Sequence, residues 1–298
     1  MNNVKKSFSI RDMENLSGIK AHTIRIWEKR YDLFQPERTT TNIRTYSLSS
    51  LQKLLNITLL YNNGYKISKI AKIQENEIPE IVKNLTIEKN ENDSAINAFK
   101  LSMVNFDQSL FTRTYDSLLN KKSFREIFYE VFIPLLTELG LLWQTDTISP
   151  SHEHFITNLI KQKIYSETEK LQYDVPRKDA VFALFLPENE IHELGLLYIN
   201  YEIVRSGYKS IYLGQTMPIE SLNDLVKYYN AVNFISYFTV SPTKEKIEKY
   251  IHEFSTILNE SPNSRLWLLG RQIQHISQDI LPNTIKTFSS IEELTAEL

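Results

Sequence analysis

The feature that most constrains the fold of this 298-residue chain is a regular alternation in its C-terminal part. Five short apolar runs, each suited to a buried strand, are separated by amphipathic stretches suited to helices. The apolar runs are residues 180–186, 210–213, 234–238, 266–269 and 285–288, and the helical stretches lie near 192–206, 219–229, 243–258, 271–279 and 290–298. Because strands that alternate with helices form a parallel sheet with both faces covered, residues 176–298 are expected to form a doubly wound, five-stranded α/β domain of flavodoxin-like strand order.

The composition excludes several kinds of site and protein. The chain has no cysteine, which excludes disulfide bonds, thiolate metal sites and a cysteine nucleophile. No apolar run approaches the roughly 18 residues that a membrane-spanning helix needs, and residues 1–10 lack the apolar stretch of a secretory signal. We therefore expect a cytoplasmic protein that has no membrane partner.

The charges are divided unevenly along the chain. Residues 1–73 carry thirteen Lys or Arg against five Asp or Glu, a net charge of +8. Residues 74–298 carry twenty-one against thirty-one, a net charge of −10. A basic first part on an acidic remainder is typical of a protein whose first domain binds a polyanion such as a nucleic acid.

Two short helices are expected near the start of the chain. Residues 9–12 have the pattern of a capping box, and Gly18 separates the first helix from a second that begins near Ala21. The apolar residues of the second helix are spaced to face inward, which leaves a basic outer face of His22, Arg25 and Lys29. Two helices joined by a glycine turn, the second of them basic, form a helix-turn-helix.

A basic hairpin follows the second helix. Residues 36–39 and 43–46 are two short extended pieces around a polar tip, and they carry Arg38, Arg44 and Tyr46. Two more helices are expected between residue 47 and residue 73. The sequence therefore predicts a winged helix-turn-helix domain over residues 1–75 that binds double-stranded DNA.

This first part resembles the MerR family of winged-helix regulators. The resemblance is carried by the segments FSIRDMENLSGI, TIRIWEKRYDLFQPERT and IRTYSLSSL. It implies that the second helix enters the major groove of operator DNA. It also implies contacts to phosphates or bases by Arg25, Arg38, Arg44 and Tyr46. Phosphate contacts make affinity fall steeply with salt and specify little of the DNA sequence.

Amphipathic segments between these two parts predict a four-helix bundle over residues 76–175. The segments lie near residues 80–104, 108–120, 123–142 and 151–171, and the short polar connections between them favour antiparallel neighbours. Trp143 closes the third helix, and Glu153 and His154 lie in the first turn of the fourth. An indole, a carboxylate and an imidazole are therefore expected at one end of the bundle.

The first strand of the α/β domain is followed by a candidate ligand. Glu190-x-His192-x-x-Gly195 places an imidazole at the carboxyl edge of the sheet, where open α/β sheets bind ligands. A carboxylate two residues before the histidine can accept its second ring N–H, as the partners of metal-bound imidazoles do. No Gly-x-Gly-x-x-Gly follows this strand, which counts against a dinucleotide. Three histidines, His152, His154 and His192, are candidates for a bare metal site. No carboxylate or cysteine stands at ligand spacing from them, which counts against such a site.

The spacing in the bundle resembles a cobalamin signature. Trp143-x9-Glu153-His154 is similar to the helical-domain signature of cobalamin-dependent photoreceptor regulators of the CarH/LitR type. The resemblance implies that these residues cover the upper face of the corrin and contact its adenosyl group. Gln144 follows Trp143, where photoreceptor members have a histidine, so light-driven bis-histidine chemistry is not implied.

The motif after the first strand resembles the cobalamin-binding motif Asp-x-His-x-x-Gly. The resemblance implies that His192 coordinates cobalt from below and that Glu190 orients it. It also implies that the nucleotide tail of the cofactor threads into the sheet beside Ser236, with Gly195, Gly214 and Gly270 at the same edge. Leu269 stands where the family has the first glycine of a Gly-Gly pair, and its side chain can narrow that channel.

These features predict a transcriptional repressor that binds operator DNA and senses cobalamin, preferentially adenosylcobalamin, between its bundle and its α/β domain. Because a winged head needs a two-fold partner to bind a palindrome, a homo-oligomer is expected, either a dimer or a tetramer. No catalytic pair is recognised, so the protein is not expected to be an enzyme. Two alternatives stay open: a regulator whose tail has lost cobalamin and senses a protein or another small molecule, and a corrinoid carrier for a methyltransferase.

Overall fold

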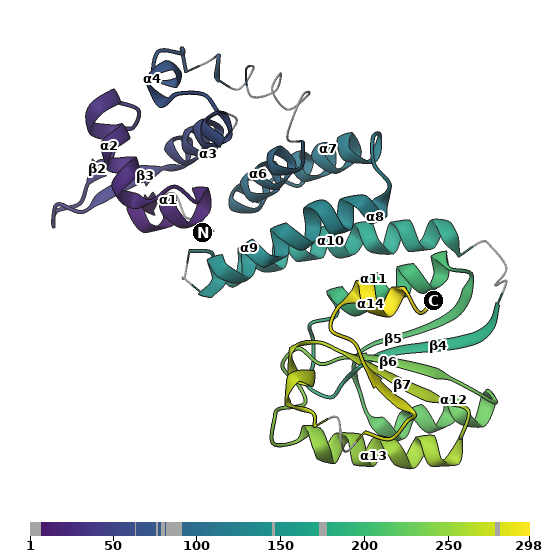
Figure 1. The fold of residues 1–298 in the computed structure, drawn as a ribbon. Helices are drawn as coiled ribbons and strands as arrows, with labels where there is room; N and C mark the ends of the chain where they lie inside the picture. The colour runs from purple at the N-terminus through teal and green to yellow at the C-terminus, as the bar shows by residue number, and fades with distance from the viewer. Residues whose placement is uncertain are drawn as a thin grey trace. The chain divides into compact units, whose positions relative to one another are not determined.

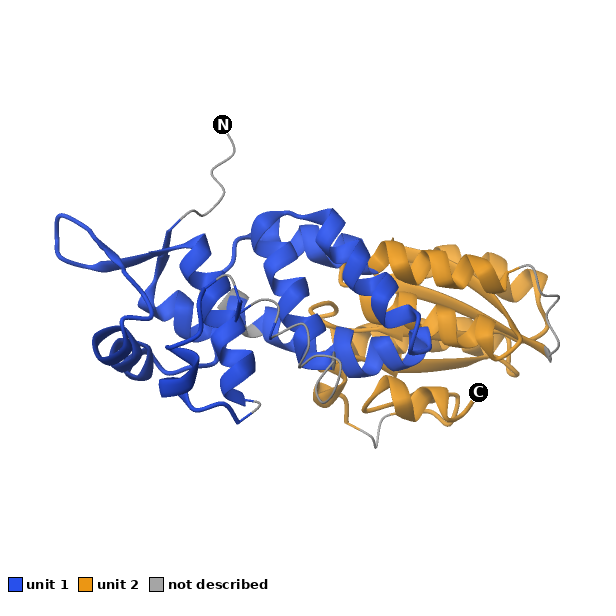
Figure 2. Cartoon of the chain, turned by 90° about the horizontal axis from the view of Figure 1, so that it is seen from above, with its two compact units in different colours: residues 1–160 blue, residues 161–298 orange. Residues whose placement is uncertain are grey.

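The computed structural model describes residues 7–62, 64–75, 77–78, 81, 91–144, 147–172, 178–277 and 281–298. Within these ranges the side chains of Glu91, Leu141, Trp143, Gln144 and Lys178 lie outside the description. The chain divides into two compact units, residues 1–160 and 161–298, which Figure 2 colours blue and orange. Helix α10 (Pro150–Leu171) belongs partly to each unit. The predicted division at residues 75 and 175 stays a prediction.

The first part of unit 1, called the head here, contains residues 7–75. Its elements are β1 (Ser7–Ser9), α1 (Ile10–Ser17), α2 (Ala21–Tyr31), β2 (Glu37–Arg38), β3 (Arg44–Ser47), α3 (Leu48–Asn62) and α4 (Ile67–Ile70). Strand β3 pairs antiparallel with both β1 and β2. The expected hairpin is therefore part of a three-stranded sheet, and β1 is a strand that the sequence pattern did not predict.

Local sequence signals explain where the head's first helix begins and ends. The Ser9 hydroxyl accepts from the amide of Asp12 at 3.1 Å, and the Asp12 carboxylate accepts from the amide of Ser9 at 2.8 Å. This reciprocal pair is the expected capping box. Gly18 ends the helix in the left-handed region at φ 75°, which favours glycine.

The rest of unit 1 is a helical bundle with an aromatic core. Its elements are α6 (Glu91–Asn105), α7 (Gln108–Leu119), α8 (Phe124–Ile127), the π-helical turn η1 (Phe128–Phe132) and α9 (Ile133–Gln144), with the first part of α10. Phe99, Phe111 and Phe132 pack with ring centroids 4.8–6.4 Å apart. Helices α8, η1 and α9 form one continuous rod, so the described chain has the four antiparallel segments of the predicted bundle. Residues 82–90, where the first of them was expected to begin, lie outside the described ranges.

Buried polar contacts join the head to the bundle within unit 1. Lys100 of α6 is 6% exposed, forms an ion pair with Glu138 of α9, and donates from Nζ to the carbonyl of Leu16 at 3.5 Å. The Asn15 amide donates to the hydroxyl of Thr147 at 2.8 Å. Because Leu16 and Asn15 belong to α1, the first helix of the head is held against both α6 and the segment after α9.

Unit 2 is a five-stranded parallel sheet covered by helices on both faces. Its strands are β4 (Lys178–Pro187), β5 (Tyr208–Met217), β6 (Asn233–Tyr237), β7 (Arg265–Leu269) and β8 (Ile285–Thr287), in the order β5-β4-β6-β7-β8. Helices α11 (Leu194–Arg205) and α14 (Ile291–Thr295) lie over one face, and α12 (Asn223–Tyr228) and α13 (Ile247–Glu260) over the other (Figure 1). This confirms the expected doubly wound fold of flavodoxin-like order.

Two of the expected helices in unit 2 are shorter than the pattern indicated. The stretch near 219–229 is a 3-10 turn, η2 (Ile219–Leu222), followed by α12. In the stretch near 271–279, residues 271–277 are described and contain the 3-10 turn η3 (Arg271–His275), so the α-helix expected there was wrong for these residues. The amide of Gln272 donates to the carbonyl of Phe238 at 2.9 Å, so this turn is bound to the end of β6 and does not continue as an α-helix.

The face of the sheet under α12 and α13 holds a buried aromatic core. Phe185 of β4 stacks on Phe254 of α13 with ring centroids 5.8 Å apart, and Phe234 of β6 contacts both rings edge-on. Burying each such side chain contributes about 1.5–3 kcal/mol relative to leaving it in water. The described helices include none that is both long and apolar enough to cross a lipid bilayer.

Candidate functional site

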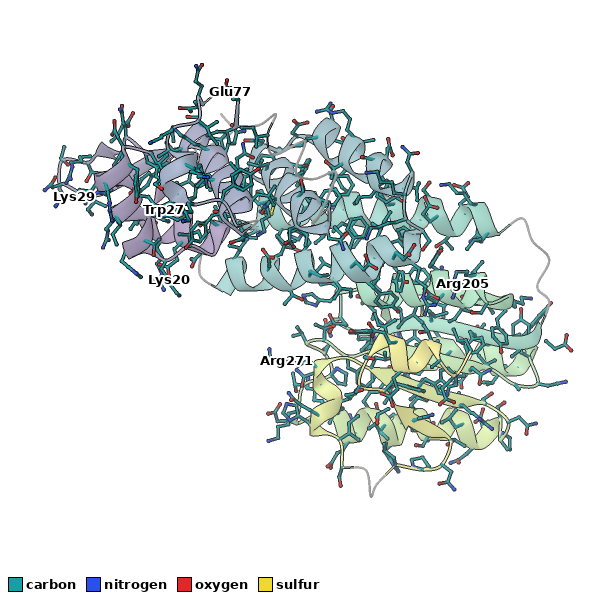
Figure 3. All side chains as sticks on the ribbon, turned by 45° about the horizontal axis from the view of Figure 1, so that its top comes forward. Lys20, Trp27, Lys29, Glu77, Arg205 and Arg271 are labelled. Atoms are coloured by element: carbon teal, nitrogen blue, oxygen red, sulfur yellow. The ribbon has the colours of Figure 1, made fainter. Side chains whose placement is uncertain are left out.

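Helix α2 of the head presents its basic residues to solvent on one side. His22, Arg25 and Lys29 are exposed, whereas Ile24 and Trp27 are buried. Figure 3 shows Lys29 at the outer edge of the head and Trp27 inside it. Because residues three and four positions apart are neighbours on a helix, these basic side chains form one stripe. The predicted groove-facing set is therefore brought together on a single face.

The wing places two more arginines directly opposite each other. Arg38 of β2 pairs with Arg44 of β3. The exposed Arg38 guanidinium donates to Asn42 Oδ1 at 2.7 Å near the tip of the wing. Arg44 Nε donates to Glu28 Oε1 of α2 at 2.9 Å, and this hydrogen bond to a carboxylate raises the pKa of Arg44. Arg38 thus lies at the surface, whereas Arg44 is held against α2.

Tyr46 lies in the core of the head and not on its outer face. Its side chain is 1% exposed, and its hydroxyl donates to Glu28 Oε2 at 2.9 Å. Burial, and then the hydrogen bond to Glu28, raise the pKa of Tyr46. A buried hydroxyl that already donates to an internal carboxylate has no surface to offer DNA. The expected DNA contact by Tyr46 is therefore replaced by a structural role: with Arg44, it fixes β3 to α2 through Glu28.

In unit 2, the loop after β4 is organised by one buried carboxylate. Glu190 has no exposed surface. Its Oε1 accepts from Nδ1 of His192 at 2.6 Å and from the amide of His192 at 3.0 Å. Its Oε2 accepts from three successive amides of the loop after β6, at 2.6–3.1 Å: Thr239, Val240 and Ser241. One carboxylate therefore joins the histidine loop to the loop of the neighbouring strand.

These donors keep Glu190 ionised although it is buried. Burial alone would raise the pKa of Glu190, but hydrogen bonds from Ser241, Val240 and His192 outweigh it and lower the pKa below its ordinary value of 4.5. An ionised acceptor at Nδ1 requires the proton of a neutral imidazole to lie on Nδ1. The lone pair of that imidazole then lies on Nε2.

The His192 ring projects from the sheet edge. Its side chain is 54% exposed while that of its partner Glu190 is fully buried. A neutral, oriented imidazole whose Nε2 lone pair lies on an exposed ring is the form of histidine that binds a metal. Across the described ranges, no group of three or more His, Cys, Asp or Glu is placed to hold a bare metal ion. The single imidazole fits a metal that brings its other ligands with it, as the cobalt of a corrin does.

The sheet face next to this loop is closed by an aromatic ring that the sequence prediction overlooked. A Cβ added to Gly195 of α11 would lie 2.8 Å from Cε2 of Tyr237, so the ring occupies the space that the glycine leaves. Ser236 precedes Tyr237 in β6 and points to the opposite face of the sheet. Its buried hydroxyl has no hydrogen-bond partner in the part of the chain that the structure describes. Gly195 and Ser236, which were expected to line one channel, are therefore not brought together.

Two other predicted glycines lie at the same edge. Gly270 follows β7 at φ 102°, and a Cβ there would lie 2.4 Å from the carbonyl oxygen of Phe238, so only glycine permits this approach of two backbones. Leu269, directly before it, is 1% exposed. Gly214 lies within β5, where it pairs with Phe185 of β4.

A polar cluster beside His192 was also missed at the sequence level. Glu193 accepts from Lys161 Nζ at 3.0 Å and from the hydroxyl of Tyr212 at 3.0 Å. Burial, followed by the charge of Glu193, raises the pKa of Tyr212. Lys161 belongs to α10 and Tyr212 to β5, so the residue after His192 is held by both elements. No short-range motif indicates this cluster, because its members lie 19 and 32 residues from Glu193.

The predicted bundle residues lie near the end of α9 and the start of α10. Glu153 and His154 are in the first turn of α10, as expected, with Glu153 Oε2 3.4 Å from His154 Nδ1. The His154 side chain is 67% exposed and that of Glu153 34% exposed. The backbone of Trp143 lies in the last turn of α9, and its side chain is outside the described part.

Comparison with known families assigns two separate parts of the chain. Residues 8–77 match the family described as MerR HTH family regulatory protein, and residues 95–166 match the family described as B12 binding domain. The chain combines a MerR-type helix-turn-helix with a B12 binding domain. The expected relation to MerR-type regulators with a cobalamin-binding tail is confirmed.

Two curated relatives match this chain over most of their length. The chain is 27% identical to the HTH-type transcriptional repressor CarH of Myxococcus xanthus over 235 residues, which cover 74% of this chain and 75% of CarH. It is 25% identical to the HTH-type transcriptional repressor CarA of the same organism over 215 residues, which cover 72% of this chain and 70% of CarA. The chain is homologous to both repressors.

A solved structure shares the fold of more than half of the chain. The Methanosarcina barkeri monomethylamine corrinoid protein superposes with a TM-score of 0.56 and 12% identity, over 69% of this chain and 97% of that protein. At this identity the likeness concerns the fold alone.

Proposed function

We propose that this protein is a DNA-binding transcriptional regulator that senses cobalamin, with His192 as the lower ligand of cobalt. The observation that carries the proposal is the contact between Glu190 and His192 at the carboxyl edge of the sheet. Bound cobalamin supplies a cobalt centre whose upper ligand can be lost or exchanged. Every other part of the proposed mechanism belongs to residues of the chain.

Glu190 and His192 have different roles at this site: Glu190 orients the ring, and His192 binds the metal. Because Glu190 holds the proton of the ring on Nδ1, Nε2 offers its lone pair without a prior change of tautomer. The three amides that bind Oε2 fix the carboxylate, so the imidazole is oriented before any ligand arrives.

The head is the part of the chain that binds DNA in this proposal. Arg25, Lys29 and the exposed Arg38 present cations on the outer side of α2 and on the wing, where they meet phosphate groups. Glu28 supports them from behind, because it fixes the wing strand to α2 through Arg44 and Tyr46. His22 completes the basic stripe on α2.

The contacts of α1 provide a physical route from the bundle to the head. A ligand alters DNA binding only if it favours one conformation or assembly of the protein over another. Lys100 with Glu138, and Asn15 with Thr147, connect α1 to α6, to α9 and to the segment after α9. A displacement of these bundle elements therefore changes the support of the helix that packs against α2.

The remaining parts of the proposal extend the resemblance. Trp143, Glu153 and His154 are proposed contacts for the upper face of the corrin, with adenosylcobalamin as the preferred form. The protein is proposed to repress its target genes as a homodimer or homotetramer. Its proposed location is the cytoplasm.

A second candidate function has one observation in its favour. The ring of Tyr237 and the side chain of Leu269 fill the face of the sheet beside Gly195, where the tail of cobalamin was expected. A regulator that kept the fold and lost the cofactor would show the same feature. A corrinoid carrier for a methyltransferase is disfavoured, because a carrier does not need a basic helix that binds the major groove of DNA.

Retention of the cofactor separates these candidates. The full-length protein is mixed with adenosylcobalamin in the dark, freed from unbound cofactor, and its visible spectrum is recorded beside those of His192→Ala and of the control His252→Ala, an exposed histidine on α13. We expect wild type and His252→Ala to retain cofactor with one spectrum and His192→Ala to lose it or show a shifted spectrum. Identical spectra in all three proteins would remove His192 from its role, and no retention by wild type would favour the second candidate.

A further inference from the structure

The lower nucleotide arm of cobalamin needs space next to the residue that binds cobalt. The arm hangs from the same face of the corrin as the lower axial ligand, so it must pass close to the histidine that binds cobalt. With His192 as that ligand, the arm needs room beside the loop that leads into α11. The inference rests on the function proposed above.

The structure shows that this room is occupied. Gly195 lies three residues after His192, and the ring of Tyr237 fits against it so closely that a Cβ would lie 2.8 Å from Cε2 and 3.1 Å from Cζ. A glycine at the start of a helix can leave a groove, but here an aromatic side chain of β6 fills it. Burial raises the pKa of Tyr237, in agreement with a ring that is largely withdrawn from water.

Leu269 extends the closed patch to the next strand. Tyr237 of β6 and Leu269 of β7 are register partners, so their side chains lie side by side on one face of the sheet. Leu266 and Leu268 belong to the core cluster on the α13 face, and Leu269 therefore points to the α11 face. Leu269 is 1% exposed, which means that no open channel reaches it.

The opposite face offers a different opening at the same edge. A pocket of about 280 Å³ is lined by residues of the β4 loop, of η2, of the loop after β6 and of α13, among them Asn189, Ser241 and Tyr250. It lies across the sheet from Gly195, because Tyr250 packs against Phe238 of the α13-face core cluster. This pocket gives a matched position at which a ring can be truncated without altering the α11 face.

We infer that Tyr237, with Leu269 beside it, excludes the nucleotide arm and makes this protein a receptor for the corrin ring and its upper ligand. In solution the benzimidazole of cobalamin occupies the lower position that His192 must take. A corrinoid without the arm, such as a cobinamide, presents no such competitor and loses no contact with the protein. The wild-type protein therefore binds adenosylcobinamide at least as tightly as adenosylcobalamin.

The test compares these two corrinoids by titration in the dark with the full-length protein. For wild type, the ratio of the Kd of adenosylcobalamin to that of adenosylcobinamide is expected to be one or larger. Tyr237→Ala opens the groove, so this ratio should fall by about tenfold, which corresponds to about 1.4 kcal/mol of new contact with the arm. Tyr237→Phe keeps the ring, and Tyr250→Ala opens the other face, so both should retain the wild-type ratio.

Three results would overturn the inference. A wild-type protein that binds adenosylcobalamin more tightly than adenosylcobinamide would overturn the inference, whether or not Tyr237→Ala folds. A fall of the ratio in Tyr250→Ala in place of Tyr237→Ala would place the arm on the α13 face and would equally overturn it. If wild type binds neither corrinoid, the proposed function fails, and the inference fails with it. The first two results leave the proposed function intact.

Discussion

Glu190 fixes the ring of His192 through a 2.6 Å contact between Oε1 and Nδ1, while its other oxygen accepts from the amides of residues 239–241. The carboxylate is fully buried and the ring that it orients is 54% exposed. The geometry of the exposed imidazole is thus set by the interior of unit 2. The same carboxylate supports both the stability of the sheet edge and the proposed binding site.

Replacing Glu190 with Gln should destabilise unit 2. A glutamine has a single carbonyl oxygen, so the amides of residues 239–241 that face its NH₂ group lose their acceptor. The NH₂ group of this fully buried side chain also becomes an unsatisfied donor, which costs about 1–3 kcal/mol, so we expect the free energy of unfolding to fall by about 3 kcal/mol in urea titrations followed by circular dichroism. Glu188→Gln is the control, because Glu188 is exposed two residues earlier. Equal stability of the two variants would contradict the role assigned to Glu190.

The contribution of Glu190 should depend on pH in a defined direction. Its pKa in the folded protein lies below the ordinary value of 4.5, so the unfolded chain takes up the proton first as pH falls. The stability that the ionised carboxylate provides is therefore fully present above pH 4.5 and is lost as pH falls through the folded pKa. The difference in unfolding free energy between wild type and Glu190→Gln should shrink over this acid range. A difference that stays constant, or grows, on acidification would contradict this assignment.

Tyr46→Phe separates a structural role from a DNA contact. The variant keeps the buried ring and removes the hydroxyl that donates to Glu28. We expect a loss of about 1 kcal/mol in the stability of unit 1, measured by thermal unfolding, and no change in DNA affinity at a temperature where the protein is folded. Weaker DNA binding with unchanged stability would restore Tyr46 to the DNA-contacting set.

Arg25→Ala should weaken DNA binding in a salt-dependent manner. Arg25 is exposed in the middle of the basic stripe of α2. Loss of one phosphate contact should lower the affinity for a duplex selected from a random library and reduce the slope of log K against log salt by about one. Fluorescence anisotropy at several salt concentrations measures both quantities. Lys249→Ala, an exposed lysine on α13, is the control, and equal slopes for both variants would refute the docking of α2.

Much of the fold could be predicted from local patterns. The capping box at Ser9, the basic stripe on α2 and the five alternating strands follow from residue spacing, and the structure has all three. Over the described residues 271–277 no α-helix forms, because the sequence pattern does not include the hydrogen bond between Gln272 and the carbonyl of Phe238 at the end of β6. Contacts between elements that are distant in sequence decide such cases.

The site was predictable only in part for the same reason. The pairing of Glu190 with His192 follows from their spacing, but the three amides that bind the carboxylate lie about fifty residues later in the chain. Ser236 and Tyr237 differ by one position, and one position exchanges the two faces of a strand. A motif match cannot reveal which of these two side chains faces Gly195. The register of the folded sheet reveals that it is Tyr237.

The central claim is that a corrinoid bound at His192 changes the affinity of the head for DNA. The most direct measurement is the Kd of the selected duplex for full-length wild type and His192→Ala, each with and without saturating adenosylcobalamin in the dark. We expect the cofactor to change the wild-type Kd by about fivefold or more, as allosteric coupling typically does, and to leave that of His192→Ala unchanged. A wild-type protein that holds the cofactor and binds DNA equally well in both states would contradict the account.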